Sequence, residues 1–235
     1  MKGAITIAEA AATLIADPRP ILCLDTCDFL DVVRGFEEDG NNHSAMVHRL
    51  VDPLISSANN IQPVITYLVR HEWEQNVDAV GKRASAHLRE TDRRIARVLN
   101  SCGHVEIQAA EPPANFASLP LVQALVELAE RLMDRAMVLE RDDPCVERAL
   151  VRVMERRRPS HQGAIKDSIH LEHYLEFSRR LDQARFSEPR LFVSGNKADF
   201  WEGPPRIHRE LGGELHAVGL QFLGKLDAAL GQLGI

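Results

Sequence analysis

The chain has 235 residues, of which 45% are hydrophobic and 26% charged, so it can bury a substantial core in one large domain or two small ones. Its formal net charge of −6 argues against a wholly basic nucleic-acid-binding protein. A nuclease stays among the candidates, because bound metal ions can invert the sign of an acidic pocket. Aromatic residues are only 5%, which argues against a surface built mainly on aromatic stacking with bases.

The cysteines and the first residues bear on the compartment. The four cysteines form no CxxC pair and no Cys/His zinc spacing, so neither a disulfide scaffold nor a zinc site is predicted. No apolar run is long enough to span a bilayer, and residues 1–17 lack a signal-peptide pattern because Glu9 interrupts their apolar stretch. We therefore expect a reduced, cytoplasmic protein without a membrane partner.

In the first half of the chain, short apolar runs alternate with helical patterns. The run ILCL, residues 21–24, is continuous and ends on polar residues, which is typical of a strand covered on both faces. PVIT, residues 63–66, is a second strand candidate and leads into a helix that carries Glu72. Apolar residues at helical spacing predict further helices over 1–17, 29–40, 45–58 and about 76–100.

The second half continues the alternation. Prolines indicate a loop over 111–120, and RLFVSG, residues 190–195, is the clearest late strand. AVGLQFLG, residues 217–224, is a candidate last strand before a terminal helix. Helical stripes are predicted over 121–133, 146–158 and 164–181. Strands that alternate with helices predict an α/β fold with a mostly parallel sheet.

Acidic and carboxamide side chains follow the predicted strands. Asp25 ends the first strand, Glu72 lies shortly after the second, and Asn196 and Asp199 follow the strand at 190–195. Asp167 opens a helix. In open parallel sheets, functional groups gather beyond the carboxyl ends of the strands, so these groups are expected to converge at one edge.

A cluster of carboxylates predicts a cation. Carboxylates repel one another unless protons or cations compensate them, and oxygen-rich clusters suit Mg²⁺ or Mn²⁺. Such ions polarise a phosphoryl oxygen, lower the pKa of water and stabilise a leaving oxygen. The chemistry that this predicts is phosphodiester hydrolysis.

Four segments together resemble the PIN-domain nucleases. LDTCDFL, residues 24–30, resembles the opening motif, in which a strand ends in an aspartate followed by threonine or serine. LVRHE, residues 68–72, and KDSIHLEHYL, residues 166–175, are similar to the segments with the second and third acidic residues. FVSGNKADF, residues 192–200, resembles the closing Thr/Ser-x-Asn/Asp-x-x-Asp-Phe motif.

The resemblance implies a three-layer α/β/α sandwich that acts as a metal-dependent ribonuclease, as the often toxic active members of the family do. It implies a single domain over 1–235 with a helical insertion over roughly 76–158, which the small toxin-like members lack. The implied catalytic and metal-binding residues are Asp25, Glu72, Asp167 and Asp199, with Asn196 as a further metal ligand. The candidate substrate-binding residues are Thr26 and Ser194, which could orient a metal-bound water, and Lys166 and Lys197, which could meet a phosphate backbone.

Structural explanations compete with these roles. Asp25 and Asp167 could be helix N-caps, Asn196 could be a turn residue, and Thr26 and Ser194 could cap the turns that follow them. Glu74, two residues further on, is an alternative to Glu72 for the second acidic position of the site. We expect solvated positions for Asp28 and Asp31, and for Glu172 either a surface position or a contact that supports Asp167. We assign none of the ten histidines to a metal.

The run ERRRP, residues 155–159, has two explanations. Its cations could complement the dipole at the C-terminus of a helix that Pro159 ends, or the arginines could contact phosphate together with Lys166 and Lys197. The leading hypothesis is a Mg²⁺- or Mn²⁺-dependent ribonuclease acting on RNA. The alternatives are a catalytically silent PIN-like module that binds protein or RNA, and a DNA-directed flap nuclease, for which a helix-hairpin-helix signature is missing. The RNA target, a protein partner or antitoxin, and a homodimer stay open.

Overall fold

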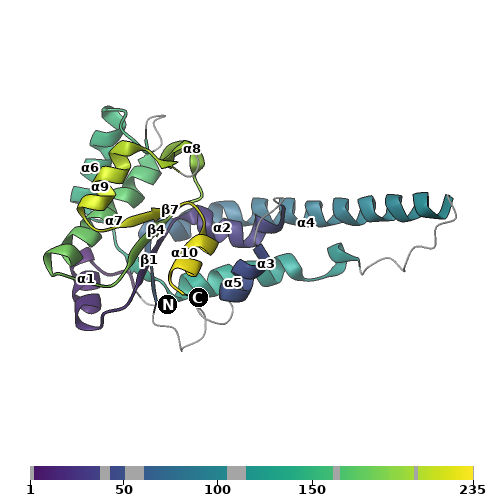
Figure 1. Cartoon of the computed structure of the whole chain (residues 1–235), viewed down its shortest axis with the longest axis horizontal. Coiled ribbons are helices and arrows are strands. Elements are labelled where there is room, and N and C mark those ends of the chain that lie inside the picture. The colour runs from purple at the N-terminus through teal and green to yellow at the C-terminus, as the bar shows by residue number, and fades with distance from the viewer. Residues whose placement is uncertain are drawn as a thin grey trace.

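A five-stranded, wholly parallel sheet forms the centre of the protein (Figure 1). The computed structural model describes residues 3–37, 43–50, 61–104, 115–160, 165–203 and 206–234. The strand order is β3-β2-β1-β4-β7. The strands are β1 (Ile21–Leu24), β2 (Gln62–Thr66), β3 (Met137–Leu139), β4 (Arg190–Val193) and β7 (Gln221–Leu223).

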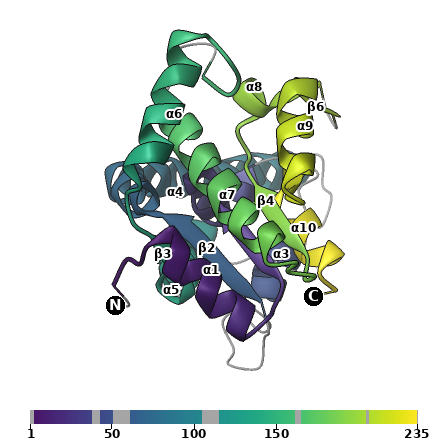
Figure 2. The ribbon, with the colours of Figure 1, turned by 90° about the vertical axis from the view of Figure 1, so that its left-hand side faces the viewer.

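Helices cover both faces of the sheet, as the continuous apolar runs predict. Leu22 and Leu24 of β1 join the core cluster on one face, whereas Ile21 and Cys23 join the cluster on the other. The first face packs against α2 (Thr26–Arg34), α3 (His43–Arg49), α4 (Tyr67–His104), α5 (Leu121–Arg135) and α10 (Leu226–Gln232). The second packs against α1 (Ile7–Ala16), α6 (Asp143–Met154), α7 (Ile165–Gln183) and α9 (Arg209–Ala217). The α/β/α sandwich is therefore confirmed, and Figure 2 shows α1, α6 and α7 on the near side of the sheet.

The sheet reverses its winding direction between β1 and β4. Successive strands lie on one side of β1, in the order β2 and β3, before the chain returns to place β4 and β7 on the other side. Register pairs Leu24 with Val193 at the carboxyl ends of β1 and β4. Open parallel sheets bind ligands beyond the strand ends at such a switch point. The position beyond the carboxyl ends of β1 and β4 is called the crevice.

A helical arm projects from the sandwich (Figure 1). Helix α4 begins at Tyr67 directly after β2 and runs for 38 residues. Its Val80 and Ala84 share a core cluster with Leu128 and Leu132 of α5, which lies alongside it. Among the described helices, none is both long and apolar enough to cross a membrane.

The helical segment expected over 76–158 also contains a strand. β3 lies within it and pairs in parallel with β2, Val64 opposite Met137 and Thr66 opposite Leu139, so part of this segment belongs to the central sheet. The sequence pattern did not predict β3. The remaining short elements are η1 (Gly35–Glu37), η3 (Phe116–Ser118), α8 (Lys197–Phe200), β5 (Trp201–Gly203) and β6 (Arg206–Ile207).

Candidate metal centre

Asp25 stands at the carboxyl end of β1, beside the end of β4. Its side chain is 3% exposed and accepts hydrogen bonds from the Thr26 backbone N–H at 2.5 Å and from Ser194 Oγ at 2.8 Å. Asp25 is also the N-cap of α2, so the capping role is real. Capping α2 does not prevent Asp25 from binding a metal ion, because a carboxylate that accepts a backbone hydrogen bond still has lone pairs for a further partner.

Asp28 corrects one sequence expectation. It is buried rather than solvated, and its Oδ2 accepts the Asp25 backbone N–H at 2.8 Å to complete a capping box. Burial, followed by the charge of Asp25, raises the pKa of Asp28 well above its usual value. Asp28 therefore supports the backbone of Asp25.

Glu72 faces the same crevice from the second turn of α4. Its Oε2 accepts Thr26 Oγ1 at 2.5 Å, and its Oε1 lies 3.1 Å from Lys166 Nζ. Burial opposes ionisation of Glu72, but hydrogen bonds and charge from His170, with those from Thr26 and Lys166, outweigh it and lower the pKa to about 2. Glu74, the alternative to Glu72 for this position, is exposed.

Asp167, Asn196 and Asp199 form the other half of the crevice. The Asn196 Nδ2 group donates to Asp167 Oδ2 at 3.0 Å and to Asp199 Oδ2 at 2.9 Å, and the Asn196 backbone N–H donates to Ser194 Oγ at 3.2 Å. Burial and then the charge of Asp25 raise the pKa of Asp167 to about 7, with smaller contributions from Asp199 and Glu72. Ser194, which also donates to Asp25, links the two halves.

His170 is the site residue that sequence reasoning missed. It is buried on α7, its Nδ1 lies 2.7 Å from Thr66 Oγ1, and its Nε2 lies 3.3 Å from Glu72 Oε2 and 4.0 Å from Asp25 Oδ1. Burial lowers the pKa of His170, but Glu72 and Asp25 outweigh it and the pKa is raised. The available signal was its position three residues after Asp167, which places both side chains on one helix face.

The donor set fits a divalent cation. One ligand atom each from Asp25, Glu72 and His170 lies within 4.8 Å of the others. Burial first, and then the charge of Asp25, raise the pKa of Asp167, and a bound cation would favour its ionised form. Carboxylate oxygens suit Mg²⁺ and Mn²⁺, and an imidazole moves the preference towards Mn²⁺ because Mg²⁺ binds mainly through oxygen.

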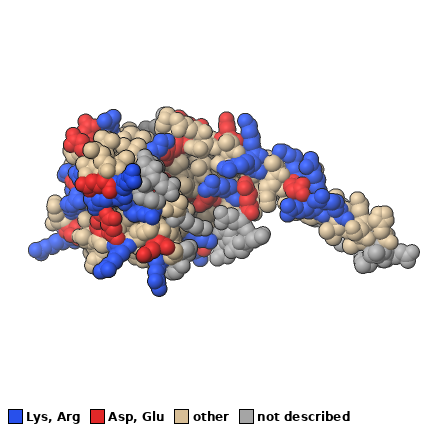
Figure 3. Space-filling model, turned by 90° about the horizontal axis from the view of Figure 1, so that it is seen from above, with Lys and Arg blue, Asp and Glu red and all other residues tan. Residues whose placement is uncertain are grey.

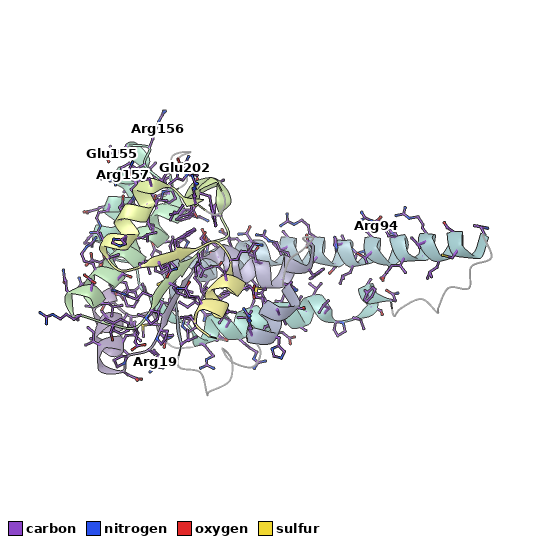
Figure 4. The ribbon with its side chains drawn as sticks, in the orientation of Figure 1. Arg19, Arg94, Glu155, Arg156, Arg157 and Glu202 are labelled. Atoms are coloured by element: carbon purple, nitrogen blue, oxygen red, sulfur yellow. The ribbon has the colours of Figure 1, made fainter. Side chains whose placement is uncertain are left out.

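The surrounding charges differ from the sequence expectations. Glu172 is buried and ion-paired with Arg148 at 2.8 Å and with the buried Arg152, so it is not a solvated surface residue. Helix α6 ends at Met154, before the arginine run. Arg157 pairs with Glu210 and Glu214 of α9, and Arg158 Nη1 donates to the carbonyl of Ala198 (Figure 4 labels Arg157).

The two lysines expected at the substrate differ in what the structure describes. Lys166 is exposed, and its Nζ lies 3.1 Å from Glu72 Oε1. The side chain of Lys197 lies outside the described part of the structure.

Comparisons with known proteins do not identify a relative. No family model matches the chain, and neither a curated protein nor a solved structure matches it significantly. The functional interpretation therefore depends on the residues of the crevice and on the four sequence segments.

Proposed function

We propose that the protein is a Mg²⁺- or Mn²⁺-dependent ribonuclease. The observation that carries this proposal is the gathering of Asp25, Glu72, Asp167 and Asp199 at the switch point between β1 and β4. Ligands bind at such switch points in open parallel sheets. RNA as the substrate is proposed on the resemblance of the four sequence segments to PIN-domain nucleases.

The ions would be held in two parts of the crevice. Asp25, Glu72 and His170 offer one ligand set, and Asp167 and Asp199, bridged by Asn196, offer another. A bound ion supplies polarisation of the phosphoryl oxygen and a lowered pKa for water.

The protein's own residues orient these groups. Thr26 holds one oxygen of Glu72, Ser194 holds one oxygen of Asp25, and Thr66 fixes the ring of His170. Such partners raise affinity because the ligand atoms are positioned before the ion binds. Lys166, half-exposed beside Glu72, is placed to meet a phosphate oxygen.

The Asp167 carboxyl can hold a proton near neutral pH, since its pKa is about 7. Loading the crevice with a cation would release that proton, because metal ligands must be deprotonated.

Cleavage of an RNA panel by purified protein tests the proposal. Wild type should cleave with Mn²⁺ or Mg²⁺ and lose activity in EDTA, and Asp25→Asn should lose activity while keeping its fold. Asp78→Asn is the matched control, because Asp78 is an exposed carboxylate on α4. Equal cleavage by Asp25→Asn would place the activity elsewhere or assign it to a contaminant.

One observation favours a second function, that of a catalytically silent binding module. Glu72 already has two cationic partners within the chain, Lys166 at 3.1 Å and His170 at 3.3 Å, so its charge is compensated without an ion. This alternative predicts no Mn²⁺-dependent thermal shift and no cleavage. The ribonuclease proposal predicts a Mn²⁺-dependent thermal shift and cleavage.

A further inference from the structure

The exposed side of the arm carries a stripe of positive charge. Between residues 82 and 97 of α4, all of which the structure describes, six lysine and arginine side chains are exposed (Figure 3). The stripe consists of Lys82, Arg83, Arg89, Arg93, Arg94 and Arg97. This concentration is notable because the chain as a whole has a net charge of −6.

The stripe occupies one side of the helix. At 3.6 residues per turn, its members fall within a sector of about 140°, whereas Val80, Ala84 and Leu88 are buried on the other side. Val80 and Ala84 belong to the core cluster that includes α5. Arg94 points away from α5 in Figure 4. The cations are therefore available to a partner, while the apolar side is covered between Val80 and Leu88.

Few acidic groups neutralise the stripe. In its sector between residues 82 and 97, Glu90 is the one carboxylate, and it lies 2.9 Å from Arg97 and 3.3 Å from Arg94. Asp92 points elsewhere, because it accepts the backbone N–H groups of Phe116 and Ala117. Arg94 and Arg97 have side chains 72% and 70% exposed, and such exposed pairs hold their partners weakly.

The stripe lies on the same side of α4 as Glu72 of the candidate metal centre. Arg83 and Arg94 follow Glu72 by 11 and 22 residues on the same helix, and 11 residues make about three turns. Both therefore project from the side of α4 on which Glu72 enters the crevice. At a rise of 1.5 Å per residue, Arg83 lies about 16 Å and Arg97 about 38 Å along the axis from Glu72.

We propose that this stripe binds the phosphate backbone of a nucleic acid strand and leads it into the crevice. The inference deepens the proposed ribonuclease function and rests on it for the identity of the strand as substrate. Guanidinium groups bind phosphate through paired hydrogen bonds, and a row of them follows a linear polyanion. A membrane surface fits less well, because an interfacial helix needs a broad exposed apolar side, and Val80, Ala84 and Leu88 on that side of α4 are buried.

Binding of a fluorescein-labelled single-stranded RNA to the full chain in EDTA tests the inference, because cleavage is then suppressed. Arg83→Gln/Arg94→Gln/Arg97→Gln should weaken binding by about tenfold to 100-fold. It should also make the slope of log K against log salt concentration shallower by about 2, since each phosphate contact on a single strand contributes about 0.7 to that slope. Glutamine preserves helix propensity, so the helical signal should not change. Glu90→Gln should tighten binding.

The control removes the same charge elsewhere: Arg131→Gln/Arg180→Gln/Arg209→Gln, three exposed cations outside the stripe, should bind nearly as well as wild type. Loss of affinity in this control equal to that of the stripe variant would overturn the inference. So would unchanged binding by the stripe variant, or binding of wild type to phosphatidylserine vesicles but not to RNA.

The two proposals fail separately. If wild type binds RNA through the stripe but never cleaves with Mn²⁺, the ribonuclease proposal fails and the binding surface stands. If wild type cleaves, and the stripe variant binds and cleaves equally well, the ribonuclease proposal stands and this inference fails.

Discussion

Replacing Asp167 by asparagine should stabilise the ion-free protein in a pH-dependent way. Burial and the neighbouring carboxylates raise the folded-state pKa of Asp167 to about 7, against about 3.9 in an unfolded chain. The protonated carboxyl therefore favours the fold below about pH 4, and this contribution is lost as the pH rises to about 7. Asparagine resembles the protonated form at every pH, so its advantage should grow over that window and then level off.

The two pKa values set the size of the effect. Their difference corresponds to at most about 4 kcal/mol above neutral pH, and partial exposure of Asp167 reduces the expected gain to about 2 kcal/mol. For a chain of this length, that gain raises Tm by about 4 to 8 °C. The Asn196 amide remains a hydrogen-bond partner, because asparagine keeps a carbonyl oxygen.

Thermal unfolding in EDTA at about pH 5 and about pH 8 measures the effect, since these values bracket most of the window. The exposed Asp78→Asn should show no comparable change. Added Mn²⁺ should reverse the order, because wild type retains the charged oxygen ligand. A variant at Asp167 that is less stable than wild type in EDTA at the higher pH would refute the electrostatic account of the crevice.

Three further predictions concern the surroundings. Arg152→Ala should lower the free energy of unfolding by about 3 to 5 kcal/mol in a urea titration, because it leaves Glu172 buried without this partner, whereas the exposed Arg141→Ala should cost less than about 1 kcal/mol. His170→Ala should weaken Mn²⁺ binding at least about tenfold by calorimetry, as loss of an oriented ligand does. One alanine inserted after Leu88 turns the distal stripe by about 100° and should impair RNA cleavage, whereas four inserted residues turn it by about 40° and should largely preserve cleavage.

The central strands could be predicted because both faces of the sheet are covered. ILCL is buried at every position, so its apolar run is uninterrupted, and β1 occupies the predicted residues 21–24. β3 escaped prediction because its three residues follow a 15-residue amphipathic helix without a proline or glycine between them. Its position as an edge strand depends on pairing with β2, which no local pattern encodes.

The site could be predicted where a residue follows a strand and not where it depends on helix packing. Asp25 and Ser194 take their positions from the ends of β1 and β4, and strand runs are visible in the sequence. His170 and Glu172 are buried by the packing of α7 against the sheet and against α6, which sequence periodicity alone does not specify. Helix α7 is buried over most of its circumference, so its polar residues gave no exposed stripe to interpret.

The continuity between β2 and α4 connects the crevice to the arm. Thr66 ends the strand and Tyr67 begins the helix without an intervening loop, so the direction of α4 is fixed by the sheet. Thr66 also contacts His170 of α7. His170 in turn lies beside Glu72, which stands on the second turn of α4. A single rigid element thus carries part of the ion site at its base and the cationic stripe along its length. Because a helix preserves angular phase over its length, the same 3.6-residue period that turns Glu72 into the crevice also determines which side of the arm presents its charge.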